Sequence, residues 1–189
     1  NRDSAGTLTS TTPSGFVKLA VIDSGVDLTH PDLDGNLVAG SVTCNTVSCL
    51  AGGADSEGHG TNVAGVALAE RNGIGMHGVA PQATFISVRV ADAIGSFSID
   101  AELNGLQYAL TQNVQVINSS YGTDAINTFT PATVRSLVTQ STGGGTREAA
   151  YQNLVSSGVI NVWAAGNDGP TIEPSVTAAL PVYFQGATS

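Results

Sequence analysis

The sequence is poor in positive charge and lacks long apolar runs, and each shortage argues against a class of protein. Six Lys and Arg residues stand against fifteen Asp and Glu, for a formal net charge of -9. A chain so poor in cations repels phosphate backbones, so nucleic acid is not expected as a partner. No apolar run reaches the roughly 18 residues that a membrane span requires. The polar opening, residues 1–15, carries no signal-peptide pattern.

Cysteine is also scarce, with only Cys44 and Cys49 in the stretch "TCNTVSCLAGG". A short disulfide between them would indicate an oxidising compartment, whereas two free thiols or a weak metal clip are the alternatives. The rest of the composition, 41% hydrophobic and 11% charged, is that of a globular chain. We expect an N-terminal extension over residues 1–15 and a single domain over residues 16–189.

Four apolar runs alternate with helix-like segments along the chain. The runs cover residues 16–23, 84–90, 114–120 and 159–166, and each is typical of a strand buried on both faces. The segments between them, residues 61–70, 98–113 and 146–158, have helical patterns. In the second, Ile99, Leu103, Leu106 and Leu110 are spaced for one apolar face, with Ser98 as a cap. This order predicts an α/β fold with a mostly parallel central sheet between helices.

Polar residues follow the strands of this predicted sheet. Asp23 ends the first strand, Ser119 and Ser120 end the third, and Asn167 follows the fourth. His59 begins a helix between two glycines, which would let backbone or substrate pass close to its ring. Because sites form outside the carboxyl ends of such strands, we expect these residues on one rim of the sheet.

Each residue alone also has a structural interpretation. Asp23 would be a turn cap, Asn167 would belong to the turn "NDG", and His30 and His77 are expected to be surface or satisfied core residues. Together, however, an Asp, a His and an Asn on one rim form an acyl-transfer set. The Asp orients the His, the His takes a proton from a nucleophile, and the Asn holds the oxyanion.

Five motifs resemble those of the subtilases, the subtilisin-like serine peptidases. They are "AVIDSGVDLTHPDL" at 20–33, "GHGTNVAG" at 58–65, "GVAP" at 78–81, "VINSSYG" at 116–122 and "AAGNDG" at 164–169. The resemblance implies that residues 16–189 are the N-terminal portion of a peptidase domain with a three-layer subtilisin-like fold, here incomplete at its C-terminus. It also implies a secreted or cell-surface endopeptidase acting on polypeptides. The stretch "VTAALPVYF" and the run "NGIGMHGVAP" also resemble autotransporter passenger subtilases.

The resemblance assigns roles to residues by position. Asp23 would be the orienting acid, His59 the general base and Asn167 the oxyanion donor. The segment that pairs with an extended substrate would contain Ser96, Phe97 and Ser98. One wall of the specificity pocket would contain Ser120, Tyr121 and Gly122, and the facing wall Ala165 and Gly166; Asp168 at the rim would favour a basic substrate side chain or be a solvated turn residue.

The chemistry itself requires no cofactor, but the resemblance implies a structural calcium ion. Asp32 and Asn72 would supply side-chain oxygens, and Glu70, Ile74 and Met76 carbonyl oxygens. A match for the family's remaining ligand near the N-terminus is missing. A metal-dependent hydrolase using Asp27, His30 and Asp32 is disfavoured, because the short spacing around Pro31 suits a turn.

The family's nucleophile lies in a Gly-Thr-Ser motif ahead of an apolar helix, and this sequence has no such motif. We expect the serine on a following segment, and a pro-region is a further expected partner. Without the serine this chain alone should be inactive. The alternative is a catalytically inactive peptide-binding fragment, but such a module has no physical need for Asp, His and Asn together.

Overall fold

One six-stranded sheet organises the protein. The computed structural model describes residues 17–122, 141–142 and 145–164, together with residues 132, 136, 139 and 167. Along the sheet the strands are β3 (Cys49–Ala51), β2 (Val42–Cys44), β4 (Thr84–Arg89), β1 (Lys18–Asp23), β5 (Val116–Ser119) and β8 (Ile160–Trp163). Neighbouring strands are parallel except in the β2–β3 hairpin. A separate short ribbon pairs β6 (Ser141–Thr142) with β7 (Gly145–Thr146).

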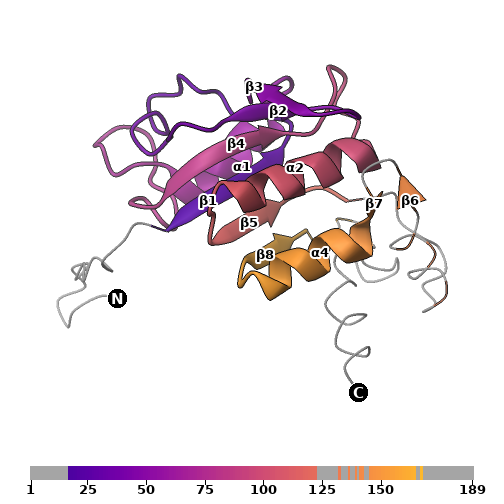
Figure 1. Ribbon diagram of the computed structural model, residues 1–189. Coiled ribbons are helices and arrows are strands. Elements are labelled where there is room, and N and C mark those ends of the chain that lie inside the picture. Colours follow the sequence, from indigo (N-terminus) through magenta and orange to yellow (C-terminus); the bar gives the residue numbers. More distant parts are fainter. Residues whose placement is uncertain are drawn as a thin grey trace.

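Helices cover both faces of the sheet, which confirms the predicted α/β fold with a mostly parallel sheet. Helices α2 (Ile99–Thr111) and α4 (Arg147–Ser156) lie side by side on one face, and α1 (His59–Leu68) lies behind the other (Figure 1). None of the helices in the described ranges is long and apolar enough to span a membrane.

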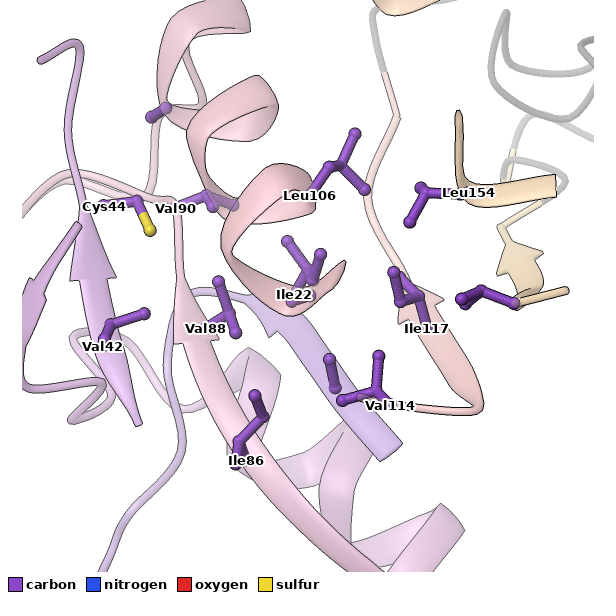
Figure 2. Close-up of a cluster of buried hydrophobic side chains, with 14 of the residues drawn as sticks. Ile22, Val42, Cys44, Ile86, Val88, Val90, Leu106, Val114, Ile117 and Leu154 are labelled. Carbon is purple, nitrogen blue, oxygen red and sulfur yellow. The ribbon is translucent and has the colours of Figure 1, made fainter. Parts of the chain in front are cut away.

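Alternate residues of β1 enter two separate apolar clusters. Ala20 and Ile22 belong to the cluster under α2 and α4, which includes Leu106 and Leu154 (Figure 2). Val21 belongs to the cluster under α1. Since successive side chains of a strand point to opposite faces, a strand covered on both sides needs apolar residues throughout. That requirement explains the unbroken run that ends at Asp23.

The buried face of α2 differs from the predicted one. Leu103 and Leu106 are buried as expected, but Ile99 and Leu110 are only partly buried. The fully covered positions instead include a charged residue, Glu102, which accepts hydrogen bonds from Arg147 Nε and the Tyr151 hydroxyl of α4. The pattern misses this face because α2 packs against a second helix as well as against the sheet.

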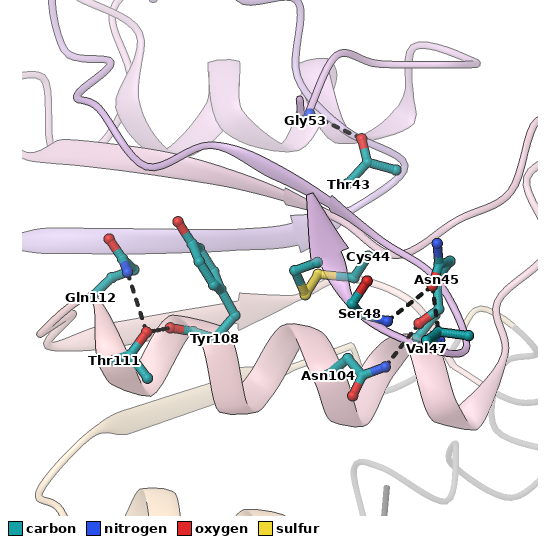
Figure 3. Close-up of a disulfide and its surroundings, with 12 residues drawn as sticks. Thr43, Cys44, Asn45, Val47, Ser48, Gly53, Asn104, Tyr108, Thr111 and Gln112 are labelled. Carbon is teal, nitrogen blue, oxygen red and sulfur yellow. Dashed lines mark hydrogen bonds between the residues drawn. A yellow bond between two sulfur atoms is a disulfide. The ribbon is translucent and has the colours of Figure 1, made fainter. Parts of the chain in front are cut away.

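Cys44 and Cys49 form a disulfide across the β2–β3 hairpin, which confirms the pairing and removes the free-thiol and metal-clip alternatives. Figure 3 shows the bond beside α2. The Asn45 side chain accepts hydrogen bonds from two backbone amides of the turn, and Asn104 of α2 donates to the Asn45 carbonyl oxygen. The hairpin is therefore closed on itself and tied to α2.

Candidate active site

The carboxyl ends of β1, β5 and β8 meet at one edge of the sheet. Asp23 is the last residue of β1, and Ile22 beside it pairs in register with Ser119, the last residue of β5. Ser119 in turn pairs with Trp163, the last residue of β8. Asn167 follows β8 in an exposed bend. The register thus places the ends of the three strands next to one another.

A short polar contact at this edge joins Asp23 to His59. Their Nδ1 and Oδ1 atoms are 2.7 Å apart, although the residues are 36 positions apart in the sequence. The Asp23 side chain is fully buried, whereas the His59 side chain is 49% exposed. Asp23 Oδ1 also accepts a hydrogen bond from the Ser24 amide at 2.7 Å. With Nδ1 facing the carboxylate, Nε2 is the ring nitrogen that can exchange a proton with a ligand.

The two glycines beside His59 have different functions. A Cβ at Gly60 would lie 2.0 Å from the Gly25 carbonyl oxygen and 3.0 Å from Asp23 Cβ, so the backbone itself fills that space. Gly58 has φ of 97°, a left-handed conformation that side chains disfavour. Gly60 therefore lets α1 approach both Asp23, at the end of β1, and the turn that follows it. The contact with the Gly25 backbone is enough to explain the glycine at position 60, without a substrate passing close to it.

The His59 imidazole lies in an acidic environment. Its pKa is raised above the usual value, first by the hydrogen bond to Asp23, while partial burial opposes the shift. The negative charges of Asp23, Glu57 and Asp55 add to the rise. Such a carboxylate fixes the tautomer of the ring and stabilises the imidazolium after proton uptake.

The segment predicted to pair with substrate is held in a turn by Asp92. Asp92 Oδ1 accepts from the backbone amides of Ile94 and Ser96, and the Asp92 amide donates to the Ser96 carbonyl oxygen. Ser96 and Ser98 are exposed. The Ser98 hydroxyl accepts from the Ala101 amide and so caps α2, as the sequence predicted.

Phe97 connects this segment to the residues after β5. Its ring stacks on Tyr121 with centroids 4.5 Å apart, so the Tyr121 side chain points inward and is buried. Burial raises the pKa of Tyr121 well above its usual value. The Ser120 hydroxyl accepts a hydrogen bond from the side-chain Nδ2 of Asn118, and Gly122 is exposed. The predicted facing wall, Ala165 and Gly166, and Asp168 lie outside the described residues.

The comparisons with known proteins decide the family. The profile of the Subtilase family matches residues 15–189. The chain belongs to the subtilase family. Subtilisin E from Bacillus subtilis strain 168 is 37% identical over 168 residues, which cover 89% of this chain and 38% of the relative. The subtilisin of Bacillus pumilus is also 37% identical, over 89% of this chain and 53% of the relative.

A third relative, the major intracellular serine protease of Bacillus subtilis strain 168, is 33% identical over 89% of this chain and 48% of its own length. The subtilase chain therefore spans about half, or less, of the length of these relatives. Because one of them is named as intracellular, the expected extracellular location stays a prediction.

Two of the predicted calcium ligands of this subtilase, Asp32 and Asn72, lie where the loop after α1 meets the Pro31–Asp32 turn. Asp32 is half-buried, its carbonyl oxygen accepts from the Glu70 amide, and a Cβ at Gly75 would meet Asp32 Oδ2. Asp32 Oδ1 is buried without a hydrogen-bond partner in the described part of the chain. Asn72 Oδ1 accepts from the Ile74 amide. An orphaned carboxylate oxygen suits a hard cation.

Other histidines and carboxylates of the described ranges do not assemble into a metal centre. No group of three or more His, Cys, Asp or Glu side chains there could hold a metal. His30 Nδ1 accepts from the Asp32 amide, and His77 Nδ1 lies 3.1 Å from the Gly78 carbonyl oxygen. Asp27 accepts from Thr29, as a turn residue does.

The sequence interpretation missed one residue at this site, Asp55. It precedes the glycine-flanked histidine and accepts hydrogen bonds from both sides of the site. Ser24 donates its hydroxyl hydrogen to Asp55 Oδ1, and the Thr61 amide donates to Oδ2. The available signal was an acidic residue just ahead of a helix whose own N-cap position is a glycine.

Proposed function

We propose that this chain supplies the acid, the base and the oxyanion donor of a serine endopeptidase that hydrolyses polypeptides. The observation that carries the proposal is the 2.7 Å contact between His59 Nδ1 and the buried Asp23 carboxylate, with the imidazole half exposed. A binding module has no need for a buried carboxylate directed at an exposed imidazole. Membership of the subtilase family supports the same chemistry.

In this proposal the nucleophile is a serine hydroxyl on a segment that follows the chain. His59 Nε2 takes its proton as the oxygen attacks the substrate carbonyl carbon, and the imidazolium is stabilised by Asp23 through Nδ1. Asn167 donates to the oxyanion. His59 then gives the proton to the leaving amine, and water hydrolyses the acyl-enzyme by the same route. This chain without the serine is then inactive.

Extended substrates would lie along the segment of Ser96, Phe97 and Ser98 and reach the wall formed by Ser120, Tyr121 and Gly122. The Phe97–Tyr121 stack links these two segments, which supports their common placement beside the rim. Main-chain hydrogen bonds to an exposed segment would supply affinity for any extended peptide.

We further propose that Asp32 and Asn72 bind a structural calcium ion together with carbonyl oxygens of residues 70, 74 and 76. The orphaned Oδ1 of Asp32 supports this, and calcium has no part in the chemical steps. The Cys44–Cys49 disulfide supports work in an oxidising compartment, secreted or at a cell surface. The autotransporter type remains a prediction, since "VTAALPVYF" lies outside the described residues.

The test of the function uses the full-length protein that contains this chain. His59→Ala should abolish peptide hydrolysis and labelling by a fluorophosphonate, while the thermal unfolding transition stays cooperative. His30→Ala is the matched control and should retain activity, because the His30 imidazole accepts a hydrogen bond from the Asp32 amide and has no contact with Asp23 among those described. Near-normal turnover by His59→Ala would refute the assignment, and failure of the wild-type protein to react would favour the inactive peptide-binding alternative.

A further inference from the structure

Asp55 lies in the loop before α1 and has no role in the chemistry proposed above. Its Oδ1 accepts hydrogen bonds from the amides of Glu57 at 3.1 Å and Gly58 at 3.0 Å, and from the Ser24 hydroxyl at 2.8 Å. Its Oδ2 accepts from the amide of Thr61 at 3.0 Å and from the Thr61 hydroxyl. Both carboxylate oxygens are therefore used, and the donors come from two separate parts of the chain.

One set of donors belongs to the first turn of α1. The N-cap position of this helix, Gly58, offers no side chain, and the first amides of a helix have no partner within it. Asp55 accepts from two of those amides, at Gly58 and Thr61, which bracket His59 in the sequence. A carboxylate there is also favoured by the helix dipole. Asp55 thus fixes the turn from which the His59 side chain projects.

The other donor belongs to the turn after β1. Ser24 gives its hydroxyl hydrogen to Asp55, and its oxygen accepts from the Gly60 amide at 2.9 Å. The Ser24 amide donates to Asp23 Oδ1 at 2.7 Å. Ser24 therefore connects Asp55 with both sides of the Asp23–His59 contact, through its hydroxyl to the Gly60 amide and through its backbone amide to Asp23. Asp55 and Ser24 together join the Asp23 turn to the His59 turn.

We propose that Asp55 is a positioning residue that, through Ser24 and the first turn of α1, holds His59 against Asp23. The inference rests on the proposed function for its meaning in catalysis. Its physical basis is geometric, because the donors to Asp55 lie in both of the elements that the 2.7 Å contact joins. A displacement of about 1 Å in a catalytic group can lower a rate about 10²-fold.

Two simpler roles predict different results. As a bare negative charge, Asp55 would act on His59 as Glu57 does, since Asp23, Glu57 and Asp55 are the charged groups that act on this imidazole. As a cap alone, it would stabilise α1 without affecting catalysis. Burial alone would raise the pKa of Asp55, but hydrogen bonds from Thr61, Gly58 and Glu57 outweigh it and hold the pKa far below its usual range. Asp55 is therefore ionised near neutral pH.

The experiment compares Asp55→Asn with Glu57→Gln in the full-length protein. Both remove one charge near His59 and preserve side-chain size, but Glu57 is exposed. We expect Asp55→Asn to lower kcat by about 10-fold to 10²-fold with little change in KM, and Glu57→Gln to change it less than about 3-fold. Ser24→Ala should show an intermediate loss of kcat. The double variant Asp55→Asn with Ser24→Ala should lose less kcat than the product of the two single losses, because the two residues act as one network.

A second measurement needs no turnover. The pH titration of His59, followed by NMR or by the pH dependence of carbethoxylation at peptide resolution, should show a lower pKa in Asp55→Asn than in Glu57→Gln. His30 and His77 serve as internal controls. This readout keeps the inference separate from the proposed function, since a protein without peptidase activity still reports whether Asp55 holds His59 on Asp23.

Three results would overturn the inference. They are equal losses in Asp55→Asn and Glu57→Gln, a loss of stability alone with unchanged kcat per folded molecule, and an unchanged His59 titration in Asp55→Asn. If Asp55→Asn does not fold, Ser24→Ala carries the test. It removes the link between Asp55 and the turn after β1, and with it the acceptor of the Gly60 amide, but it leaves the hydrogen bonds from the Gly58 and Thr61 amides to Asp55 in place. Unchanged kcat and titration in that variant would equally refute the proposal.

Discussion

Replacing Arg147 by Met tests how α4 is held against α2. Arg147 Nε donates to Glu102 Oε2 at 2.7 Å, and the two side chains are only 9% and 1% exposed. The Tyr151 hydroxyl donates to the other carboxylate oxygen at 2.8 Å. Met preserves most of the apolar stem of Arg147, so the substitution chiefly removes the positive charge and its hydrogen bond.

The expected loss follows from the burial of the pair. Removing one partner of a buried ion pair costs about 3–5 kcal/mol, because the remaining charge is left desolvated. The Tyr151 hydroxyl stays on Glu102 as a charge-assisted donor, so we expect a loss near the lower limit, about 3 kcal/mol. Against a total stability of about 5–15 kcal/mol this is a large share. The double substitution Glu102→Leu with Arg147→Met should recover much of it, because no buried charge remains.

Urea unfolding at neutral pH measures these differences, with linear extrapolation to water. The single tryptophan, Trp163, packs edge-on against Tyr151 with ring centroids 5.2 Å apart, so its fluorescence reports on this region. Arg71→Met is the matched control, since Arg71 is exposed and its loss should cost less than about 0.5 kcal/mol. A loss below about 1 kcal/mol in Arg147→Met, or a double variant no more stable than the single one, would refute the reasoning.

Three further predictions concern the site. Because the base must be neutral, the raised pKa of His59 places the acidic limb of kcat/KM at a higher pH than an unperturbed imidazole would. Asp23→Asn should move that limb to lower pH and reduce kcat by about 10⁴-fold, as pH profiles of both proteins would show. Asn167→Leu should lower kcat by about 10²–10³-fold, a size carried over from subtilisin, and a pure KM effect would assign Asn167 to binding. A calcium chelator should lower the melting temperature of the wild type but not of Asp32→Asn, and the exposed Asp34→Asn should respond like the wild type.

The repeating elements of the fold could be read from apolar runs. The predicted strands at 16–23, 84–90, 114–120 and 159–166 contain β1, β4, β5 and β8. Burial on both faces explains the apolar runs of β1 and β4. The same expectation is wrong for β8, where Ile160 and Val162 are exposed. Strands β2 and β3 have three residues each and no such apolar run. They exist because β2 pairs with β4 and the disulfide closes the hairpin.

The site shows the same division. The glycine-flanked histidine and the aspartate after an apolar run were visible as motifs, and the parallel order of strands predicted a common rim. The sequence could not show that Gly60 leaves room for the Gly25 carbonyl oxygen to pack against α1. Nor could it show that the Tyr121 ring points inward and stacks on Phe97. Nothing in the sequence distinguished Asp55 from an ordinary loop residue, because one of its hydrogen-bond donors, the Ser24 hydroxyl in the turn after β1, is 31 positions away.

By itself, therefore, the sequence determined the order of strands and helices and the residue types available at the rim. Local patterns carry that information because periodicity and turn chemistry act over a few residues. Tertiary structure alone decided the 2.7 Å contact between His59 and Asp23, the burial of Glu102 and the linking position of Asp55. These depend on the register of parallel strands and on helix packing, which bring together residues that no local pattern relates.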